Sequence, residues 1–410
     1  MHKNFLQVLT IRSFLFLWLA EICSQIAINI TNFVLILLVF ELTHSNTAVS
    51  GIVLSYTIPA IIFGILAGVL VDYWNKKRVL LYTNVTRLFL VLLLVVFHTN
   101  IFIIFFLSVS ISVATQFFIP AETPMIPLIV KKDQLLAANA FFGIGVYGST
   151  LLAYALTGPL LLFLGKTVVF LLLAAAFGVA SFLVNMVVLP FGTTDRVEKR
   201  ERSLIGASFS ALLITVRHKD IFHSLFLLIF SQVMILVLVV LGPSYAHNIL
   251  RIRVEQFPLL FITPAAFGMV VGALMLIHFW GKKSKVILAT IGVFLSSIMI
   301  FLLPFVDSIV KNIRLPFTQQ VGILHIAVVL AFFLGFANAF VFVPSNTIVQ
   351  EETTDDIRGK VYGVLNAIIG VFSLLPVILV GALADFLGVV QVLEGIGLII
   401  LIFGFYRVFF

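Results

Sequence analysis

The chain has 410 residues, of which 62% are hydrophobic and only 10% are charged, and its formal net charge is +8. A soluble domain carries about 25% charged residues, so this composition excludes a water-soluble globular protein. The single cysteine, Cys23, excludes a disulfide framework or a cysteine metal site within one chain.

Apolar runs long enough to cross a membrane follow one another along the whole chain. A transmembrane helix needs about 20 apolar residues, and such runs fall at 13–40, 48–71, 79–98, 101–121, 138–164, 167–190, 221–243, 257–279, 286–306, 323–349, 361–384 and 389–408. The pattern predicts an all-α integral membrane protein of twelve helices. We expect an N-terminal six-helix bundle at 1–192, a cytoplasmic linker at 193–220 and a C-terminal six-helix bundle at 221–410.

Basic residues gather on one predicted side of the membrane. With the N-terminus inside, all but five of the 25 lysines and arginines fall at cytoplasmic ends and loops; the exceptions are Lys166, Arg251, Arg253, Lys311 and Arg314. The positive-inside rule then predicts a multi-pass protein of the cytoplasmic membrane with both termini in the cytoplasm. The net positive charge therefore reflects how the protein is oriented in the lipid bilayer. We expect no nucleic acid partner.

The two halves share weak internal repeats, which indicate duplication of a six-helix unit, as in many transporters. The repeated patterns are Gly64-x-x-x-Gly68 with Gly268-x-x-x-Gly272, Trp74-Asn75-Lys76-Lys77 with Trp280-Gly281-Lys282-Lys283, and Pro120-x-x-Thr123 with Pro344-x-x-Thr347.

The loop between the second and third runs combines an acid with a basic cluster. Lys76, Lys77 and Arg78 are typical of a cytoplasmic anchor. Asp72 instead ends an apolar helix, where a charge makes membrane insertion costly. The positive end of another helix or a basic loop residue would compensate it, and we therefore expect a functional role for Asp72.

Polar residues share one face of the first run. Glu21, Gln25, Asn29 and Asn32 follow helical spacing, and polar groups inside a membrane usually face the bundle interior or a wet cavity. We expect them to line a transport cavity; hydrogen bonds between helices are the alternative.

Arg87, in the third run, lies at about the depth of Glu21 and needs a partner. Glu21, Glu122 and Asp72 are the candidates, and a structural ion pair is as compatible with the pattern as a substrate or proton site. Glu122 and Glu394, in the fourth and twelfth runs, could also titrate if they are buried.

Small residues and prolines mark places where helices bend or approach closely. A proline can kink a helix, and glycine lets helix backbones come near. We expect helix packing at Gly64, Gly68, Gly158, Pro159, Gly268 and Gly272.

The loop that holds Gly68, Leu70, Asp72, Lys76 and Lys77 resembles the signature loop of the major facilitator superfamily. Tyr73 and Asn75 depart from it, because the family usually has arginine and glycine there. Four further segments resemble the family's efflux branch, which includes macrolide and enterobactin exporters: 18–25, 118–127, 135–139 and 358–361.

This resemblance implies two pseudo-symmetric six-helix bundles that alternate access to a central site. It also implies that Asp72 approaches Arg358 and helps to close the cytoplasmic side. Export of a small hydrophobic molecule such as a drug or a siderophore follows from the efflux branch.

The sequence therefore predicts a secondary transporter of a small-molecule substrate that is driven by protons. We expect a monomer with no cofactor, no metal and no enzymatic activity, and Glu21 is the first candidate for the protonatable group. Two alternatives remain: an uptake carrier or uniporter of the same fold, and a polytopic membrane enzyme or assembly factor.

Overall fold

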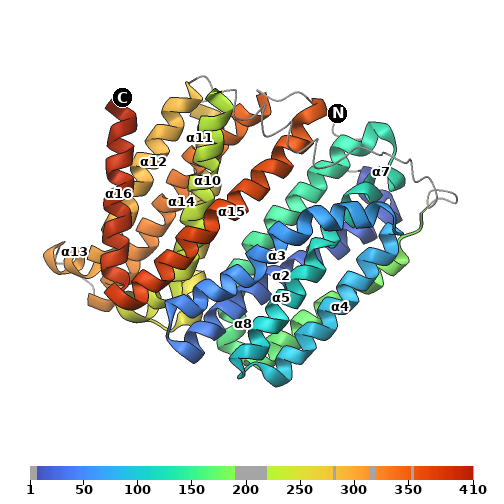
Figure 1. Cartoon of the computed structure of the whole chain (residues 1–410), viewed down its shortest axis with the longest axis horizontal. Helices are drawn as coiled ribbons and strands as arrows, with labels where there is room; N and C mark the ends of the chain where they lie inside the picture. The colour runs from blue at the N-terminus through green and yellow to red at the C-terminus, as the bar shows by residue number, and fades with distance from the viewer. Residues whose placement is uncertain (1–6, 190–218, 280–282, 314–318, 352–354, 410) are drawn as a thin grey trace. The chain divides into compact units, whose positions relative to one another are not determined.

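Long apolar helices make up almost all of the chain that the structure describes (Figure 1). The computed structural model describes residues 7–189, 219–279, 283–313, 319–351 and 355–409. These ranges contain no strand. A helix satisfies its backbone hydrogen bonds within itself, and this is what a chain without access to water requires.

The main helices up to residue 189 are α2 (Arg12–Thr43), α3 (Asn46–Asp72), α4 (Lys76–Phe97), α5 (Ile101–Gln116), α6 (Phe118–Glu122), α7 (Ile126–Ile129) and α8 (Leu135–Met186). From residue 219 they are α10 (Lys219–Tyr245), α11 (Thr263–Phe279), α12 (Lys285–Leu302), α13 (Val306–Ile313), α14 (Gln319–Glu351), α15 (Asp355–Leu387) and α16 (Val389–Phe409). Single turns named η1 to η7 join them at Val8–Thr10, Thr123–Met125, Lys132–Gln134, Ala246–Leu250, Val254–Gln256, Pro258–Ile262 and Leu303–Phe305.

Ten helical stretches of the described residues are long and apolar enough to cross a membrane. This number counts α8 once and leaves out the slightly shorter apolar part of α16. With α8 taken as two crossings and α16 added, the predicted twelve spans are recovered.

The helix α8 is two crossings because it turns back on itself at Gly165. Its 52 residues would extend about 78 Å at 1.5 Å per residue, more than twice the hydrocarbon thickness of about 30 Å. Gly165 has φ 73°, a left-handed conformation that glycine adopts without a steric penalty. Contacts with α2 confirm the reversal. Before the break, Trp18 Nε1 of α2 donates to Phe141 O (2.7 Å).

At the break itself, Lys166 pairs with Glu41 near the end of α2 (2.6 Å). After the break, Val188 N donates to Ser13 Oγ at the start of α2 (3.1 Å). The chain therefore runs along α2 in one direction and returns in the other.

The chain forms two compact units. The first unit comprises Met1–Leu42 and Leu54–Arg200, and the second comprises Thr43–Val53 and Glu201–Phe410. The start of α3 thus belongs to the second unit, and the division into six-helix bundles at 1–192 and 221–410 stays a prediction. The predicted linker lies outside the described residues except for 219 and 220, which begin α10.

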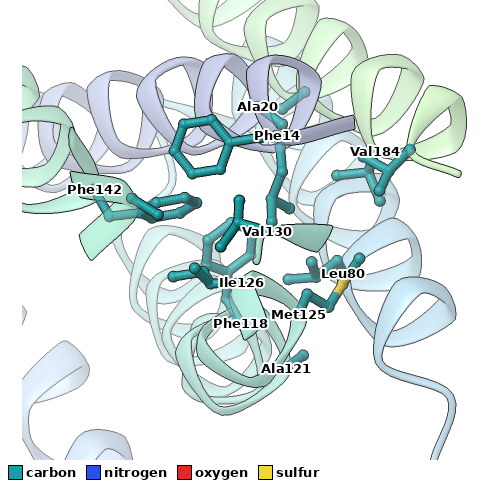
Figure 2. Packing of buried hydrophobic residues seen from close by; sticks show 14 of the residues in the cluster. Phe14, Ala20, Leu80, Phe118, Ala121, Met125, Ile126, Val130, Phe142 and Val184 are labelled. Carbon is teal, nitrogen blue, oxygen red and sulfur yellow. The ribbon is translucent and has the colours of Figure 1, made fainter. Parts of the chain in front are cut away.

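A buried apolar cluster holds the first unit together where α5 breaks into short helices (Figure 2). Phe14 of α2 meets Phe142 of α8 edge to face, with ring centroids 5.7 Å apart. The remaining labelled side chains around them are Ala20, Leu80, Phe118, Ala121, Met125, Ile126, Val130 and Val184. The cluster fixes α6, and with it Glu122, against α2 and α4.

Glycines allow the closest helix contact in the second unit. A side chain on Gly268 of α11 would overlap the carbonyl oxygen of Phe332 in α14, and one on Gly272 would meet Phe336 O at 2.8 Å. In the first unit, a Cβ on Gly64 would meet only Gln116 Oε1 at 3.9 Å, and one on Gly68 would meet no described atom within 4 Å. The second glycine pair therefore lies where two helix backbones touch, and a Cβ at either glycine of the first pair would have room.

The other predicted packing position lies inside α8. Gly158 is buried and Pro159 is half-buried in the first arm of this helix. The observed break of α8 falls at Gly165, outside that pair.

Candidate functional site

Three charged side chains are buried together in the first unit. Glu21 of α2 is 1% exposed, Arg87 of α4 is 1% exposed and Glu122 at the end of α6 is 5% exposed. Desolvating charges is expensive unless they compensate one another, and charged groups inside a membrane usually mark substrate or proton pathways. This cluster is therefore the candidate functional site.

Arg87 is held by hydrogen bonds and by two aromatic rings. Its Nη2 donates to Asn84 Oδ1 (2.9 Å) and its Nε donates to the carbonyl oxygen of Thr83 (3.3 Å). The guanidinium carbon lies 4.6 Å from the ring centre of Phe118 and 4.9 Å from that of Phe177. These distances are typical of cation–π contacts, so Arg87 is oriented by neutral groups.

The two carboxylates lie close to each other and to Arg87. Glu21 Oε1 accepts a hydrogen bond from Gln25 Nε2 (2.9 Å). The carboxyl group of Glu122 lies beside that of Glu21, near enough for a hydrogen bond when one of them carries a proton. Both carboxylates attract Arg87.

Direct ion pairing does not explain the cluster. Within the described part of the chain, ion pairs closer than 4.0 Å join Lys166 to Glu41, Lys285 to Glu351 and Lys311 to Asp307. The predicted partners Glu21 and Glu122 therefore act on Arg87 through their electric field. Two ionised carboxylates and one arginine carry a net charge of −1, and one bound proton makes the cluster neutral.

Asn84 and Ser24 complete the cluster and were missed by the sequence analysis. Ser24 Oγ of α2 donates to Asn84 Oδ1 (3.2 Å), the same oxygen that binds Arg87. Asn84 is fully buried and lies three residues before Arg87, on the same helical face. That spacing of two polar residues in an apolar helix was the available signal.

Three buried polar atoms of the cluster lack a hydrogen-bond partner among the described residues. They are Glu21 Oε2, Asn84 Nδ2 and Glu122 Oε1. Buried polar atoms are usually paired, so the site has unused capacity to bind a proton or a polar ligand.

The other predicted cavity residues lie farther along α2 or in the second unit. Asn29 Nδ2 donates to Gln25 O (2.8 Å) and to Thr150 Oγ1 of α8 (3.4 Å). Asn32 is half-buried. Glu394 is half-buried in α16 of the second unit.

The lysines of the loop after α3 bind the ends of helices. Lys76 Nζ donates to Asp72 O at the end of α3 (2.9 Å), and Lys77 Nζ donates to Asn185 O near the end of α8 (2.7 Å). Unpaired carbonyls at helix C-termini attract cations. Asn75 Oδ1 accepts from Arg78 N (3.1 Å) and so caps the start of α4.

The predicted gate is described only in part. Asp72 and Arg78 are exposed. Arg358 lies in helix α15 of the second unit, but its side chain is outside the described part of the structure. The approach of Asp72 to Arg358 therefore stays a prediction.

A buried charged cluster inside a bundle of membrane-spanning helices is typical of secondary transporters. The sequence pattern of the Major Facilitator Superfamily matches residues 17–325, and the chain therefore belongs to this superfamily.

One curated relative is Macrolide efflux protein A of Streptococcus pyogenes. It is 22% identical over 385 residues, which cover 91% of this chain and 89% of the relative. Two solved structures share the fold. The nucleoside transporter NupG matches with a TM-score of 0.75 and 14% identity, over 97% of this chain and 98% of that one.

The second structure is a bacterial homologue of the iron transporter ferroportin. It matches with a TM-score of 0.70 and 15% identity, over 97% of this chain and 98% of that one. The family and these relatives are transporters, so the protein is a multi-pass membrane transporter of small molecules rather than an enzyme.

Proposed function

We propose that the protein exports a small hydrophobic molecule from the cytoplasm by alternating access, in exchange for protons. The observation that carries the proposal is the buried pair of Glu21 and Glu122 beside Arg87. The relative named as a macrolide efflux protein supports the direction of transport and the class of substrate.

The cluster suits proton coupling because its net charge changes between −1 and zero. When both carboxylates are ionised, Arg87 is attracted strongly toward them. A proton shared by Glu21 and Glu122 weakens that attraction, and the aromatic rings of Phe118 and Phe177 still hold the guanidinium group. Protonation therefore changes the forces between α2, α4 and α6 without removing the packing that holds them.

In this proposal the remaining polar residues line the pathway and the loop controls its inner end. Gln25, Asn29 and Asn32 extend the polar face of α2 beyond Glu21 and offer hydrogen bonds to a passing molecule. Asp72 and Arg358 close the cytoplasmic side. We further propose a monomer in the cytoplasmic membrane, with both termini inside.

A proteoliposome assay tests the coupling with a macrolide antibiotic as the probe. We expect Glu21→Gln to lower export driven by a pH gradient at least about tenfold, within the range of ordinary coupling free energies. Glu41→Gln is the matched control, because Glu41 lies on the same helix in a surface ion pair with Lys166. It should retain export within about twofold, since exposed ion pairs contribute little.

Normal export by Glu21→Gln that still follows the pH gradient would rule out this site as the point of coupling. Loss of export in Glu41→Gln to the same extent would assign the effect to folding of α2 instead.

The second candidate is an uptake carrier of the same fold, because the buried cluster by itself sets no direction of transport. The direction of transport distinguishes the exporter from the uptake carrier. Cells that produce the protein should accumulate less of the antibiotic than cells that lack it; greater accumulation would favour uptake.

A further inference from the structure

The beginning of α3 is bound by an acidic residue from another helix. Asp385 lies in the last turn of α15, and residues 43–53 belong to the same compact unit as residues 201–410. The contact is therefore internal to the second unit. It plays no part in the buried cluster of the first unit.

Both carboxylate oxygens of Asp385 bind the first turn of α3. Oδ1 accepts from the backbone N of Asn46 (2.6 Å) and from its Nδ2 (2.9 Å). Oδ2 accepts from Ser45 Oγ (2.6 Å) and from the backbone N of Thr47 (2.9 Å). Ser45 Oγ in turn accepts from Ala48 N (3.2 Å).

The first N–H groups of a helix have no partner within it, and the helix dipole favours a negative charge at this end. A capping residue next to the helix usually supplies the acceptor for these N–H groups. Here the carboxylate of Asp385, from a distant helix, supplies acceptors as well. Ser45 caps Ala48 N locally, but Asp385 binds the N–H groups of Asn46 and Thr47 only while α15 lies against α3.

The contact between α3 and α15 is closely fitted along two turns. Ser50 Oγ donates to the carbonyl oxygen of Val377 (2.7 Å). A side chain on Gly381 would overlap Ser50 Oγ and would approach Asn46 O at 2.7 Å. Glycine at 381 therefore lets the two helices touch, and Asp385 is one turn farther along α15.

The helix α3 nevertheless belongs to both units. Residues up to Val53 pack with the second unit, and residues from Leu54 pack with the first. Alternating access requires one repeat to move against the other. During such a motion α3 must either leave Asp385 or bend near Pro59, which lies inside the helix.

We propose that Asp385 is a releasable cap of α3, which holds the helix start in the conformation described here and lets it go when the outer end of the pathway opens. The inference rests on the proposed function as an alternating-access carrier. Release is favoured over bending because Asp385 is exposed, so water replaces each lost hydrogen bond at a small net cost.

A reversible cross-link tests release against bending. Ser45→Cys and Asp385→Cys are introduced together, with the single native cysteine replaced by Cys23→Ser. The Ser45 and Asp385 side chains are already in contact at 2.6 Å, so cysteines at these two positions start close to each other for oxidation. We expect the oxidised protein to lose export of the macrolide probe in proteoliposomes, and dithiothreitol to restore it. Export by the fully cross-linked protein would overturn the proposal in favour of bending at Pro59.

A second readout does not depend on transport. Ser50 is 2% exposed, so a Ser50→Cys reporter in the Cys23→Ser background is protected while the cap is closed. We expect Asp385→Asn to raise its labelling by a membrane-impermeant maleimide at least about fivefold.

Asp307→Asn is the matched control, because Asp307 pairs with Lys311 (2.6 Å) on the same predicted side of the membrane. It should leave the labelling rate unchanged. If the Cys23→Ser parent protein exports no macrolide, the proposed function fails while labelling still decides the cap. If Asp385→Asn labels at the rate of the parent protein, the cap is not releasable and the inference is wrong.

Discussion

The two units of this transporter bury different chemistry. The first unit buries Glu21, Arg87 and Glu122, whereas the buried polar side chains of the second unit are serine, threonine and asparagine over the residues the structure describes. The second unit instead has the closer backbone packing, through Gly268 and Gly272. Two halves with shared sequence patterns have thus come to differ, with charge concentrated in one and close helix contact in the other.

The largest expected effect is on packing. A Gly268→Val side chain would overlap the backbone of α14, and overpacking against backbone costs about 3 kcal/mol or more. Gly64→Val, at the equivalent position of the first unit, should change stability by no more than about 0.5 kcal/mol. Thermal unfolding in detergent measures both. Equal losses would show that the first glycine pair also packs closely.

A smaller effect is expected for polar contacts in the charged cluster. Asn84→Ala removes the acceptor shared by Ser24 and Arg87 and leaves buried donors unpaired, at a cost of about 1–3 kcal/mol. Ser297→Ala in the second unit is the comparison, because Ser297 Oγ only donates to Phe294 O of its own helix (2.6 Å).

The comparison variant should cost about 1 kcal/mol or less. Asn84→Ala should also lower export, since Arg87 loses the shorter of its two hydrogen bonds within α4 and keeps the one to Thr83 O. If both variants unfold at the same denaturant concentration, the polar contacts of the two units are equivalent in stability.

The smallest effect is expected at the surface loop. Lys77→Ala removes a cation from the carbonyl end of α8, which is worth about 0.3–1 kcal/mol. Lys76→Ala should cost no more, because Lys76 binds the end of the helix just before it. Neither should alter export as strongly as Asp72→Asn if the acid, and not the lysines, controls the gate. The ranking is checked by assaying the three variants side by side.

Sequence alone predicted the spans well because membrane crossing requires long apolar runs, and each run folds by local hydrogen bonding. It also located the break of α8, because the predicted runs end at residue 164 and resume at residue 167, and Gly165 turns the chain there with a positive φ. It could not reveal that the start of α3 is bound by Asp385, because that contact comes from a distant helix.

The sequence pointed to some members of the charged cluster and not to others. Equal depth in the membrane brought Glu21 and Arg87 together as candidates, and Glu122 followed as a buried acid. The aromatic contacts of Arg87 could not be foreseen, because the chain has 43 phenylalanines and only tertiary packing selects Phe118 and Phe177. The role of Asn84 likewise depends on a contact with Ser24 from another helix.

The single-residue reversal at Gly165 has a consequence for biosynthesis. The two arms of α8 are joined without a polar loop, and Lys166 is the charged residue at the turn. We expect the two arms to leave the translocon together as a helical hairpin. Lys166 would then pair with Glu41 of α2, which is synthesised earlier. Lengthening this turn with a flexible insert would uncouple the arms, and glycosylation mapping of nascent chains would then detect the second arm outside the bilayer.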